Sequence, residues 1–294
     1  MTKGNMQEQK AITGGEVIEQ WITTKDGVPM YTKTWKAISS RPIATVVFIH
    51  GISEHVNRYD YVFSKFSNKN IEVFAHDQRG FGQTAVRNNN PGEPGSWDVA
   101  LNDINDVIIA QRKPGIPQFL MGHSMGGSLG LHYASYGPEK DNLAGFVISV
   151  PSVTLISALA KVANFLNMII PNYHISLPLH PKYMTHDPEM QKQLREDPLI
   201  FKTVSINTIA TVILEGKALL ESKYVSITSP IYICHGSDDP VIFQESSKEL
   251  YEKIPSQDKT YRLWPGLYHE PHNEFEKDQV IDDYLQWILA RVKE

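Results

Sequence analysis

A serine held between glycines is the clearest chemical signal in the sequence. Ser124 stands at the centre of Gly122-His123-Ser124-Met125-Gly126, which has the pattern G-x-S-x-G. Residues 118–121 predict a strand before the pattern, and residues 125–136 predict a helix after it. Small neighbours allow a tight turn that lifts the serine hydroxyl clear of the sheet. We therefore expect Ser124 to be a catalytic nucleophile at a helix N-terminus, where backbone N–H groups favour negative charge.

A serine hydroxyl is a weak nucleophile at neutral pH, so it needs a base that a third group orients. With this motif the expected chain order is serine, acid, histidine. Asp239 follows a strand predicted over 231–234 and is the expected acid, whereas Asp238 is expected to stabilise the turn. His269 lies in the loop after the strand predicted over 260–264 and is the expected base. His272, three residues further on, is the alternative.

The same chemistry needs two N–H donors that bind the oxyanion formed during ester cleavage. The backbone N–H of Met125, directly after the nucleophile, is one expected donor. The other is the N–H of Ile52, in the loop after a strand predicted over 44–49. His123 and His235 also end predicted strands near this edge, and we interpret both as structural histidines.

Strands and helices alternate along most of the chain, which predicts an α/β fold with a mostly parallel sheet covered by helices. Val17 to Trp35 predicts a hairpin with an Asp26-Gly27 turn. The predicted organisation is a disordered N-terminus at 1–15, a core made of 16–151 and 226–294, and a helical insertion at 152–225 without strands of its own.

Composition and charge exclude several classes of protein. The 294 residues include 28 Lys and Arg against 33 Asp and Glu, a net charge of −5, so no nucleic-acid partner is expected. The single cysteine, Cys234, excludes an intrachain disulfide and a thiolate zinc cluster. No signal peptide and no run of ~20 apolar residues is present. We expect a cytoplasmic globular protein that needs neither metal nor organic cofactor.

Six motifs occur in a fixed order between residues 44 and 272. They are His50-Gly51-Ile52-Ser53-Glu54-His55 with Arg58-Tyr59, Asp77-Gln78-Arg79-Gly80-Phe81-Gly82, Gly122 to Gly127, Asp197-Pro198-Leu199, His235-Gly236-Ser237-Asp238-Asp239 and Gly266-Leu267-Tyr268-His269. In these motifs the sequence resembles α/β-hydrolases of the monoacylglycerol lipase family, nearest to fungal members. The resemblance implies the α/β-hydrolase fold, a cap at 152–225 over a long apolar acyl tunnel, and cleavage of monoacylglycerol into glycerol and fatty acid.

The resemblance also implies a small polar pocket for glycerol, shaped by Glu54, Arg58 and His272. Leu194 stands where some family members have a pocket tyrosine, and the cap lacks the cysteines that animal relatives have near the tunnel. Asp77 and Arg79 are interpreted as structural supports of the loop below the site.

The stretch from Leu155 to Ile170 is apolar nearly all round, and only Lys161, Asn164 and Asn167 interrupt it. It is shorter than the ~20 residues that span a bilayer. It can pack on the core as a cap or leave an apolar patch for a lipid surface. Our hypothesis is that this stretch lines the acyl entrance and touches a membrane or lipid droplet transiently.

The predicted function is therefore that of a serine esterase that degrades monoacylglycerols through an acyl-enzyme intermediate. The alternative is a broader carboxylesterase or a lysophospholipase with the same catalytic triad. A proline-type aminopeptidase would need an acidic pair for the peptide amine, which the sequence does not identify. A hydrolase-fold protein without catalysis usually lacks a triad member, and here all three are present.

Overall fold

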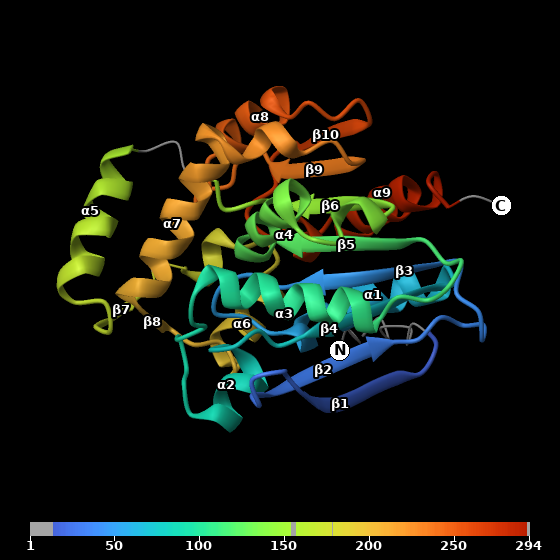
Figure 1. The fold of residues 1–294 in the computed structure, drawn as a ribbon, viewed down its shortest axis with the longest axis horizontal. Helices are drawn as coiled ribbons and strands as arrows, with labels where there is room; N and C mark the ends of the chain where they lie inside the picture. The colour runs from blue at the N-terminus through green and yellow to red at the C-terminus, as the bar shows by residue number, and fades with distance from the viewer. Residues whose placement is uncertain (1–13, 154–156, 178, 293–294) are drawn as a thin grey trace, which may run out of the picture.

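An eight-stranded sheet forms the centre of the molecule (Figure 1). The computed structural model describes residues 14–153, 157–177 and 179–292. The strand order is β1-β2-β4-β3-β5-β6-β9-β10; β1 and β2 are antiparallel, and the six strands from β4 to β10 in that order run parallel. The strands are β1 (Val17–Thr23), β2 (Pro29–Trp35), β3 (Ala44–Ile49), β4 (Ile71–His76), β5 (Gln118–His123), β6 (Gly145–Ser149), β9 (Ile231–Gly236) and β10 (Lys259–Trp264).

The inner strands are buried on both faces, because helices cover the sheet from each side. Every residue of β3, β4, β5, β6 and β9 is buried, which explains their nearly continuous apolar runs. The predicted α/β fold with a mostly parallel sheet is confirmed. So is the predicted hairpin, whose turn places Gly27 at a φ of +89°.

Two layers of helices enclose two hydrophobic cores. One layer contains α3 (Trp97–Ala110), α4 (Met125–Tyr136) and α8 (Gln244–Lys253), whereas α1 (Asp60–Asn68) and α9 (Lys277–Leu289) cover the opposite face. The remaining helices of the core are α2 (Gly82–Asn88) and the short 3-10 turns η1 (Val56–Tyr59), η2 (Lys140–Asn142) and η5 (Pro271–Asn273). The sequence did not predict α2.

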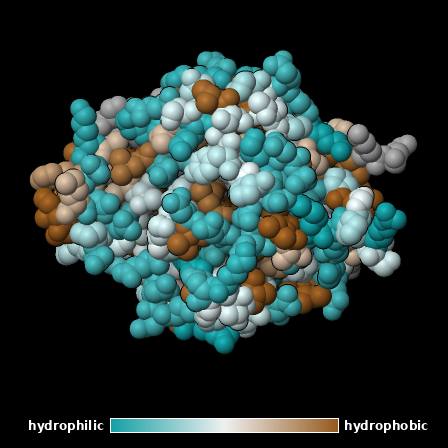
Figure 2. Space-filling view, in the orientation of Figure 1, coloured by the Kyte–Doolittle hydropathy of each residue, from teal (hydrophilic) through white to brown (hydrophobic). Residues whose placement is uncertain are grey.

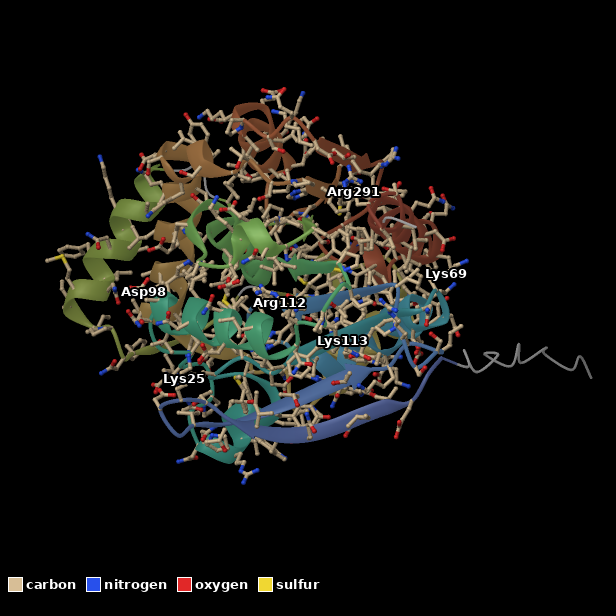
Figure 3. The ribbon with its side chains drawn as sticks, turned by 45° about the vertical axis from the view of Figure 1, so that its right-hand side comes forward. Lys25, Lys69, Asp98, Arg112, Lys113 and Arg291 are labelled. Carbon is tan, nitrogen blue, oxygen red and sulfur yellow. The ribbon has the colours of Figure 1, made fainter. Side chains whose placement is uncertain are left out.

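The helix α3 shows which edge of the sheet carries the site. Asp98 in its first turn lies near the inserted segment, and Arg112 and Lys113, just after its last residue Ala110, lie at the other end (Figure 3). There Arg112 pairs with Glu139 and Lys113 pairs with Glu72. The chain then enters β5, so the carboxyl ends of the parallel strands lie on the side of the insertion, where ligands of such sheets bind.

The insertion forms a cap over that edge of the sheet. It contains α5 (Ser157–Ile169), η3 (Pro181–Tyr183), α6 (Pro188–Glu196), α7 (Ile206–Glu221) and η4 (Lys223–Ser226). In Figure 1 α5 lies outermost and packs against α7, which in turn packs against α4 of the core. The predicted limits of the cap, 152 and 225, stay a prediction, and its residues 154–156 and 178 lie outside the described residues, as do residues 1–13 of the N-terminus.

The expectation that the insertion has no strands was wrong. Two strands, β7 (His174–Ser176) and β8 (Thr203–Ser205), pair in antiparallel fashion as a separate sheet. Each has three residues, which is too short to show a period of two in the sequence. They pair because the cap brings together segments that are far apart in the chain.

Candidate active site

Ser124 occupies a strained turn between β5 and α4. Its φ of +54° and ψ of −118° lie in a region that non-glycine residues rarely adopt, at a cost of about 1–3 kcal/mol. A Cβ at Gly122 would lie 2.2 Å from the carbonyl oxygen of Gly126, and a Cβ at Gly126 would lie 2.2 Å from that of Ile49. The two glycines of the motif are therefore required by the packing of the turn.

The structure brings Ser124, His269 and Asp239 together from the ends of three strands. The Ser124 Oγ lies 3.0 Å from His269 Nε2, and His269 Nδ1 lies 2.9 Å from Asp239 Oδ2. All three side chains are buried. A carboxylate only accepts, so Nδ1 carries the proton of the neutral ring and Nε2 accepts from the serine. Asp238 instead accepts a hydrogen bond from Ser237 at 2.6 Å and stays outside this set.

The charges of this set are tuned by burial and by each other. Burial disfavours the imidazolium, but the negative charge and hydrogen bond of Asp239 outweigh it and raise the pKa of His269 above the ordinary value of 6.5. Burial alone would raise the pKa of Asp239. The charges and hydrogen bonds of the two histidines beside it outweigh burial and hold the pKa of that carboxyl below its usual range. The carboxylate thus stays ionised and stabilises a proton on His269.

A second histidine, His235, also contacts the acid. Its Nε2 lies 3.2 Å from Asp239 Oδ2 and 2.9 Å from the carbonyl oxygen of Ile242. The other carboxylate oxygen accepts the N–H groups of Val241 and Ile242 at 2.7 and 3.2 Å. Asp239 is therefore held at both oxygens, and His235 has the structural role expected for it.

The loop after β3 carries the expected oxyanion donor Ile52. His50 is neutral, because burial lowers its pKa to about 4. Its Nε2 accepts the N–H of Gln78 at 2.9 Å, and its Nδ1 donates to the carbonyl oxygen of Gly51 at 2.7 Å. Ile52 lines the same cavity as Ser124, and the N–H of Met125 is among the free N–H groups at the start of α4.

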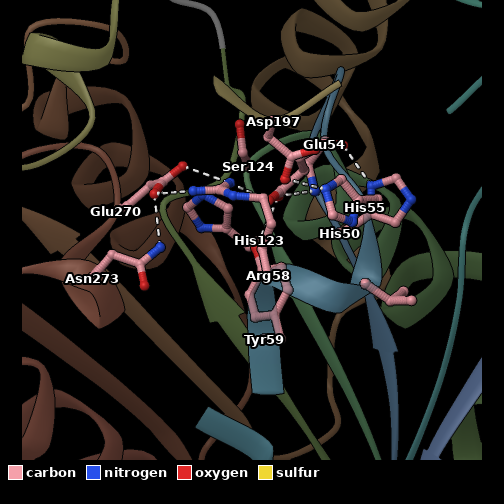
Figure 4. Close-up of polar contacts among 12 residues, drawn as sticks. His50, Glu54, His55, Arg58, Tyr59, His123, Ser124, Asp197, Glu270 and Asn273 are labelled. Carbon is pink, nitrogen blue, oxygen red and sulfur yellow. Dashed lines mark hydrogen bonds and ion pairs between the residues drawn. The ribbon is translucent and has the colours of Figure 1, made fainter. Parts of the chain in front are cut away.

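A buried cluster of three charges lies beside the nucleophile (Figure 4). Arg58 donates to Glu54 at 2.6 Å and holds Glu270 by two bonds, at 2.9 and 2.6 Å. Glu54 also accepts the N–H of Gly51 at 2.5 Å and the hydroxyl of Tyr59 at 2.8 Å. Burial alone would raise the pKa of Glu270, but Arg58 outweighs it and the pKa falls below its usual range. The cluster carries one excess negative charge and fixes the loop that precedes α1.

The three residues implied for a glycerol pocket do not share one surface. Glu54 and Arg58 line the cavity above Ser124, together with Glu270. His272 stacks on Tyr59 with ring centroids 5.1 Å apart and is not among the described lining residues. Burial lowers the pKa of His272 to about 3, so the ring is neutral. The structure therefore places Glu270, which the sequence did not indicate, where His272 was expected.

The cavity over the site has a volume of about 730 Å³. Its polar lining includes Ser124, His269 and the three charged residues described above, and the cap adds Arg195 and Lys202. The cap contributes most of the apolar lining through Leu177, Leu179, Met184, Leu194, Ile200 and Phe201. A large cavity with an apolar wall and a few convergent polar groups suits a ligand that is partly apolar and partly polar.

A clasp joins the cap to the loop of His269. We use this name for the contacts of Met184 and His186 with residues 268–274. The N–H of Glu270 donates to the carbonyl oxygen of Met184 at 2.8 Å. Glu274, fully buried, accepts the N–H of His186 at 2.8 Å and that of Tyr268 at 3.0 Å. The sequence carried no signal for Glu274, because its partners in the cap lie more than eighty residues away.

The motifs that looked structural in the sequence support the surrounding loops. Asp77 accepts the N–H groups of Val56 and Gln83 at 2.9 and 2.7 Å, and burial raises its pKa to about 7. Arg79 pairs with Asp26 and Asp103 on the other side of the loop. Within the cap, Asp197 contacts His55 at 2.8 Å.

The fold and the site define a serine hydrolase of the α/β-hydrolase class. Residues 40–276 match the model of a family described as serine aminopeptidase, S33. A Schizosaccharomyces pombe protein named "Putative monoglyceride lipase" is 34% identical over 90% of this chain and 71% of its own length. The human monoglyceride lipase is 28% identical over 92% of this chain and 90% of its own. The chain belongs to the serine aminopeptidase S33 family of α/β-hydrolases and stands among its monoglyceride lipases.

A solved structure supports the same relationship. A soluble variant of the Saccharomyces cerevisiae monoglyceride lipase, in complex with a substrate analogue, superposes with a TM-score of 0.87 at 26% identity and covers 96% of this chain and 97% of its own. The predicted resemblance, the α/β-hydrolase fold and the assignment as a serine ester hydrolase are confirmed.

Proposed function

We propose that this protein hydrolyses monoacylglycerols to glycerol and a free fatty acid, with Ser124 as nucleophile, His269 as general base and Asp239 as its orienting acid. The observation that carries the proposal is the hydrogen-bonded series Ser124–His269–Asp239, which opens into a capped, largely apolar cavity. The names of the relatives point to the same substrate.

In the acylation step, His269 Nε2 takes the proton of Ser124 as Oγ attacks the ester carbonyl carbon. The carbonyl oxygen gains the negative charge, and we assign the N–H groups of Ile52 and Met125 as its donors, each worth about 10²–10³ in rate. The tetrahedral intermediate then expels the glycerol oxygen, which receives the proton from His269. The acyl chain stays on Ser124 as an ester.

In the deacylation step, a water molecule gives its proton to His269 and attacks the acyl carbon. The carbon–Oγ bond breaks, and Ser124 Oγ leaves with the electron pair and takes the proton back. The products are a fatty acid and the free enzyme. The apolar cap residues suit the acyl chain, whereas Glu54, Arg58 and Glu270 supply acceptors and donors suited to a polyol.

We also propose that the outer helix of the cap docks on a lipid surface. On α5 the side chains of Phe165, Met168 and Ile169 are 61%, 77% and 60% exposed. A hydrophobic patch lies at the same end of the molecule in Figure 2. Among the described residues no helix is long and apolar enough to cross a membrane. The exposed apolar side chains of α5 support peripheral contact of this cytoplasmic protein with a membrane or lipid droplet that holds its substrate.

Replacement of the nucleophile tests the proposed function. Ser124→Ala should fold normally and lose ester turnover by about 10⁴-fold or more, because covalent catalysis is removed. His269→Asn should lose as much turnover as Ser124→Ala on every ester. His272→Asn, the matched control in the same loop, should retain most turnover. A fluorophosphonate probe that labels wild type and Ser124→Ala equally would contradict the assignment.

A substrate panel separates the proposal from its alternative. We expect hydrolysis of mono-oleoylglycerol to exceed that of di- and trioleoylglycerol, of a lysophospholipid and of short esters in kcat/KM. Glu54, Arg58 and Glu270 offer donors and acceptors for the hydroxyls of a polyol head group. A lysophospholipid or a short ester as the best substrate would replace the proposed function by a lysophospholipase or a general carboxylesterase.

A further inference from the structure

A second hydroxyl, that of Ser152, contacts the reacting atom of the nucleophile. Ser152 lies just beyond the end of β6, and its Oγ is 3.3 Å from Ser124 Oγ. The residue is only 6% exposed. Its N–H donates to the carbonyl oxygen of Ser124 at 3.2 Å, and its carbonyl oxygen accepts the hydroxyl of Ser128 at 2.9 Å. The backbone therefore fixes Ser152 on both sides.

The direction of this hydrogen bond follows from the rest of the site. Because Asp239 accepts from Nδ1 of His269, the neutral ring accepts at Nε2, and the single proton of Ser124 is directed there. The Ser124 hydroxyl therefore has no proton left for Ser152 and can only accept from it. Ser152 Oγ must be the donor of this bond. A distance of 3.3 Å corresponds to a weak bond to a neutral oxygen, and such bonds tighten when charge develops.

Ser152 approaches the nucleophile from the protein side. It is absent from the described residues that line the 730 Å³ cavity, whereas Ser124 and His269 are among them. Its hydroxyl can therefore act on Ser124 Oγ without contacting the acyl chain or the glycerol.

We propose that Ser152 is a further catalytic residue, which donates a hydrogen bond to Ser124 Oγ and accelerates breakdown of the acyl-enzyme. This inference rests on the proposed function, because it takes Ser124 as the nucleophile. In deacylation the bond between the acyl carbon and Oγ breaks, the electron pair goes to Oγ, and the proton comes from His269. The donor stabilises the negative charge that builds on Oγ until that proton arrives.

The effect falls on deacylation more than on acylation. In the free enzyme Ser124 Oγ is a hydroxyl oxygen that already accepts from Ser152, so the bond gains less strength between the ground state and the transition state of acylation. In the acyl-enzyme Oγ is the single-bonded oxygen of an ester, whose electron pairs are withdrawn by the carbonyl and which accepts weakly. Only interactions that strengthen from ground state to transition state accelerate a step. Ser152 therefore accelerates the second step more than the first.

Removal of the hydroxyl separates the two steps in the kinetics of a p-nitrophenyl ester. With such a reactive leaving group, breakdown of the acyl-enzyme limits kcat, whereas kcat/KM reports acylation. A neutral hydrogen bond is typically worth a factor of about 2–10. In Ser152→Ala we expect kcat and KM to fall together by about 2–10-fold and kcat/KM to stay within about twofold.

Two variants and one direct measurement complete the test. Ser152→Thr retains the hydroxyl and should restore kcat. Ser256→Ala removes a buried hydroxyl that donates to the carbonyl oxygen of Ser229, away from the site, and should leave the kinetics unchanged. Mass spectrometry after an acid quench, at an ester concentration below the wild-type KM, should find more acyl-enzyme in Ser152→Ala than in wild type.

The outcomes distinguish the inference from the function on which it rests. A parallel loss of kcat and kcat/KM in Ser152→Ala, or no change in either, would show that Ser152 is only structural. Equal amounts of acyl-enzyme in both proteins at an ester concentration below the wild-type KM would lead to the same conclusion. Turnover that survives in Ser124→Ala would instead overturn the proposed function itself.

Discussion

The charge of Asp239 sets the pH at which His269 can act as a base. It raises the pKa of His269 above 6.5, and the base must be neutral, so the acid limb of kcat/KM should lie above pH 6.5. In Asp239→Asn the negative charge is gone and burial remains, so the acid limb should move to lower pH while kcat falls by about 10⁴-fold.

The measurement is kcat/KM against pH for wild type and variant with one soluble ester. Asp238→Asn is the matched control, because that carboxylate bonds Ser237 and lies outside the catalytic set. Its profile should coincide with that of wild type. If Asp238→Asn shifts the acid limb and Asp239→Asn does not, the two aspartates exchange roles.

At the scale of single elements, α5 should control attachment to lipid and leave the chemistry intact. Replacing Phe165, Met168 and Ile169 by serine exposes no core, since these side chains already face outward. Each substitution removes apolar surface that would be buried in a lipid surface. The three substitutions together should weaken binding to liposomes at least about tenfold. Turnover of a soluble short ester should stay within twofold.

The control for α5 replaces Ile38 and Phe275, which are also exposed but lie outside the cap. This variant should bind liposomes of phosphatidylcholine and mono-oleoylglycerol as wild type does in a sedimentation assay. Equal binding by the α5 variant and wild type would show that α5 is not the docking element.

For the molecule as a whole, buried histidines should make the fold sensitive to mild acid. Burial lowers the pKa of His50, His76 and His132 to about 4 and that of His123 and His272 to about 3. Unfolding returns them to about 6.5, so the unfolded chain binds more protons and stability falls as the pH drops below 6.5. Asp77 has the opposite effect, because burial raises its pKa to about 7. At pH 5 its carboxyl is protonated in the folded protein and ionised in the unfolded chain, so unfolding releases one proton there.

These six groups alone predict that unfolding takes up about four protons near pH 5. Urea unfolding at pH 7, 6 and 5 should give steadily lower free energies of unfolding. His132→Asn, remote from the catalytic set, should reduce the steepness by about one proton. A stability that is flat between pH 7 and 5 would contradict the neutral state of these histidines.

The sequence predicted those features that depend on local pattern. The buried strands have continuous apolar runs, and the Ser124 turn has glycines at the two positions where a Cβ would clash. Asp239 and His269 follow strands in the required order, so topology alone brought them to one edge. By contrast, Glu270 and Glu274 act through Arg58 and His186, which only the folded chain places beside them. Short strands such as β7 show no period, and Ser152 has no motif.

The clasp between residues 184–186 and the loop of His269 has a consequence for how a lipid enters. If the cap swung away as a rigid lid, the bonds of Met184 and Glu274 would drag the imidazole off the serine. We therefore expect a lipid to enter at the far border of the cap, which is formed by α5, whose main packing partner among the described residues is α7. Movement of this border of the cap would admit an acyl chain, while the clasp on the opposite side keeps Ser124 and His269 aligned.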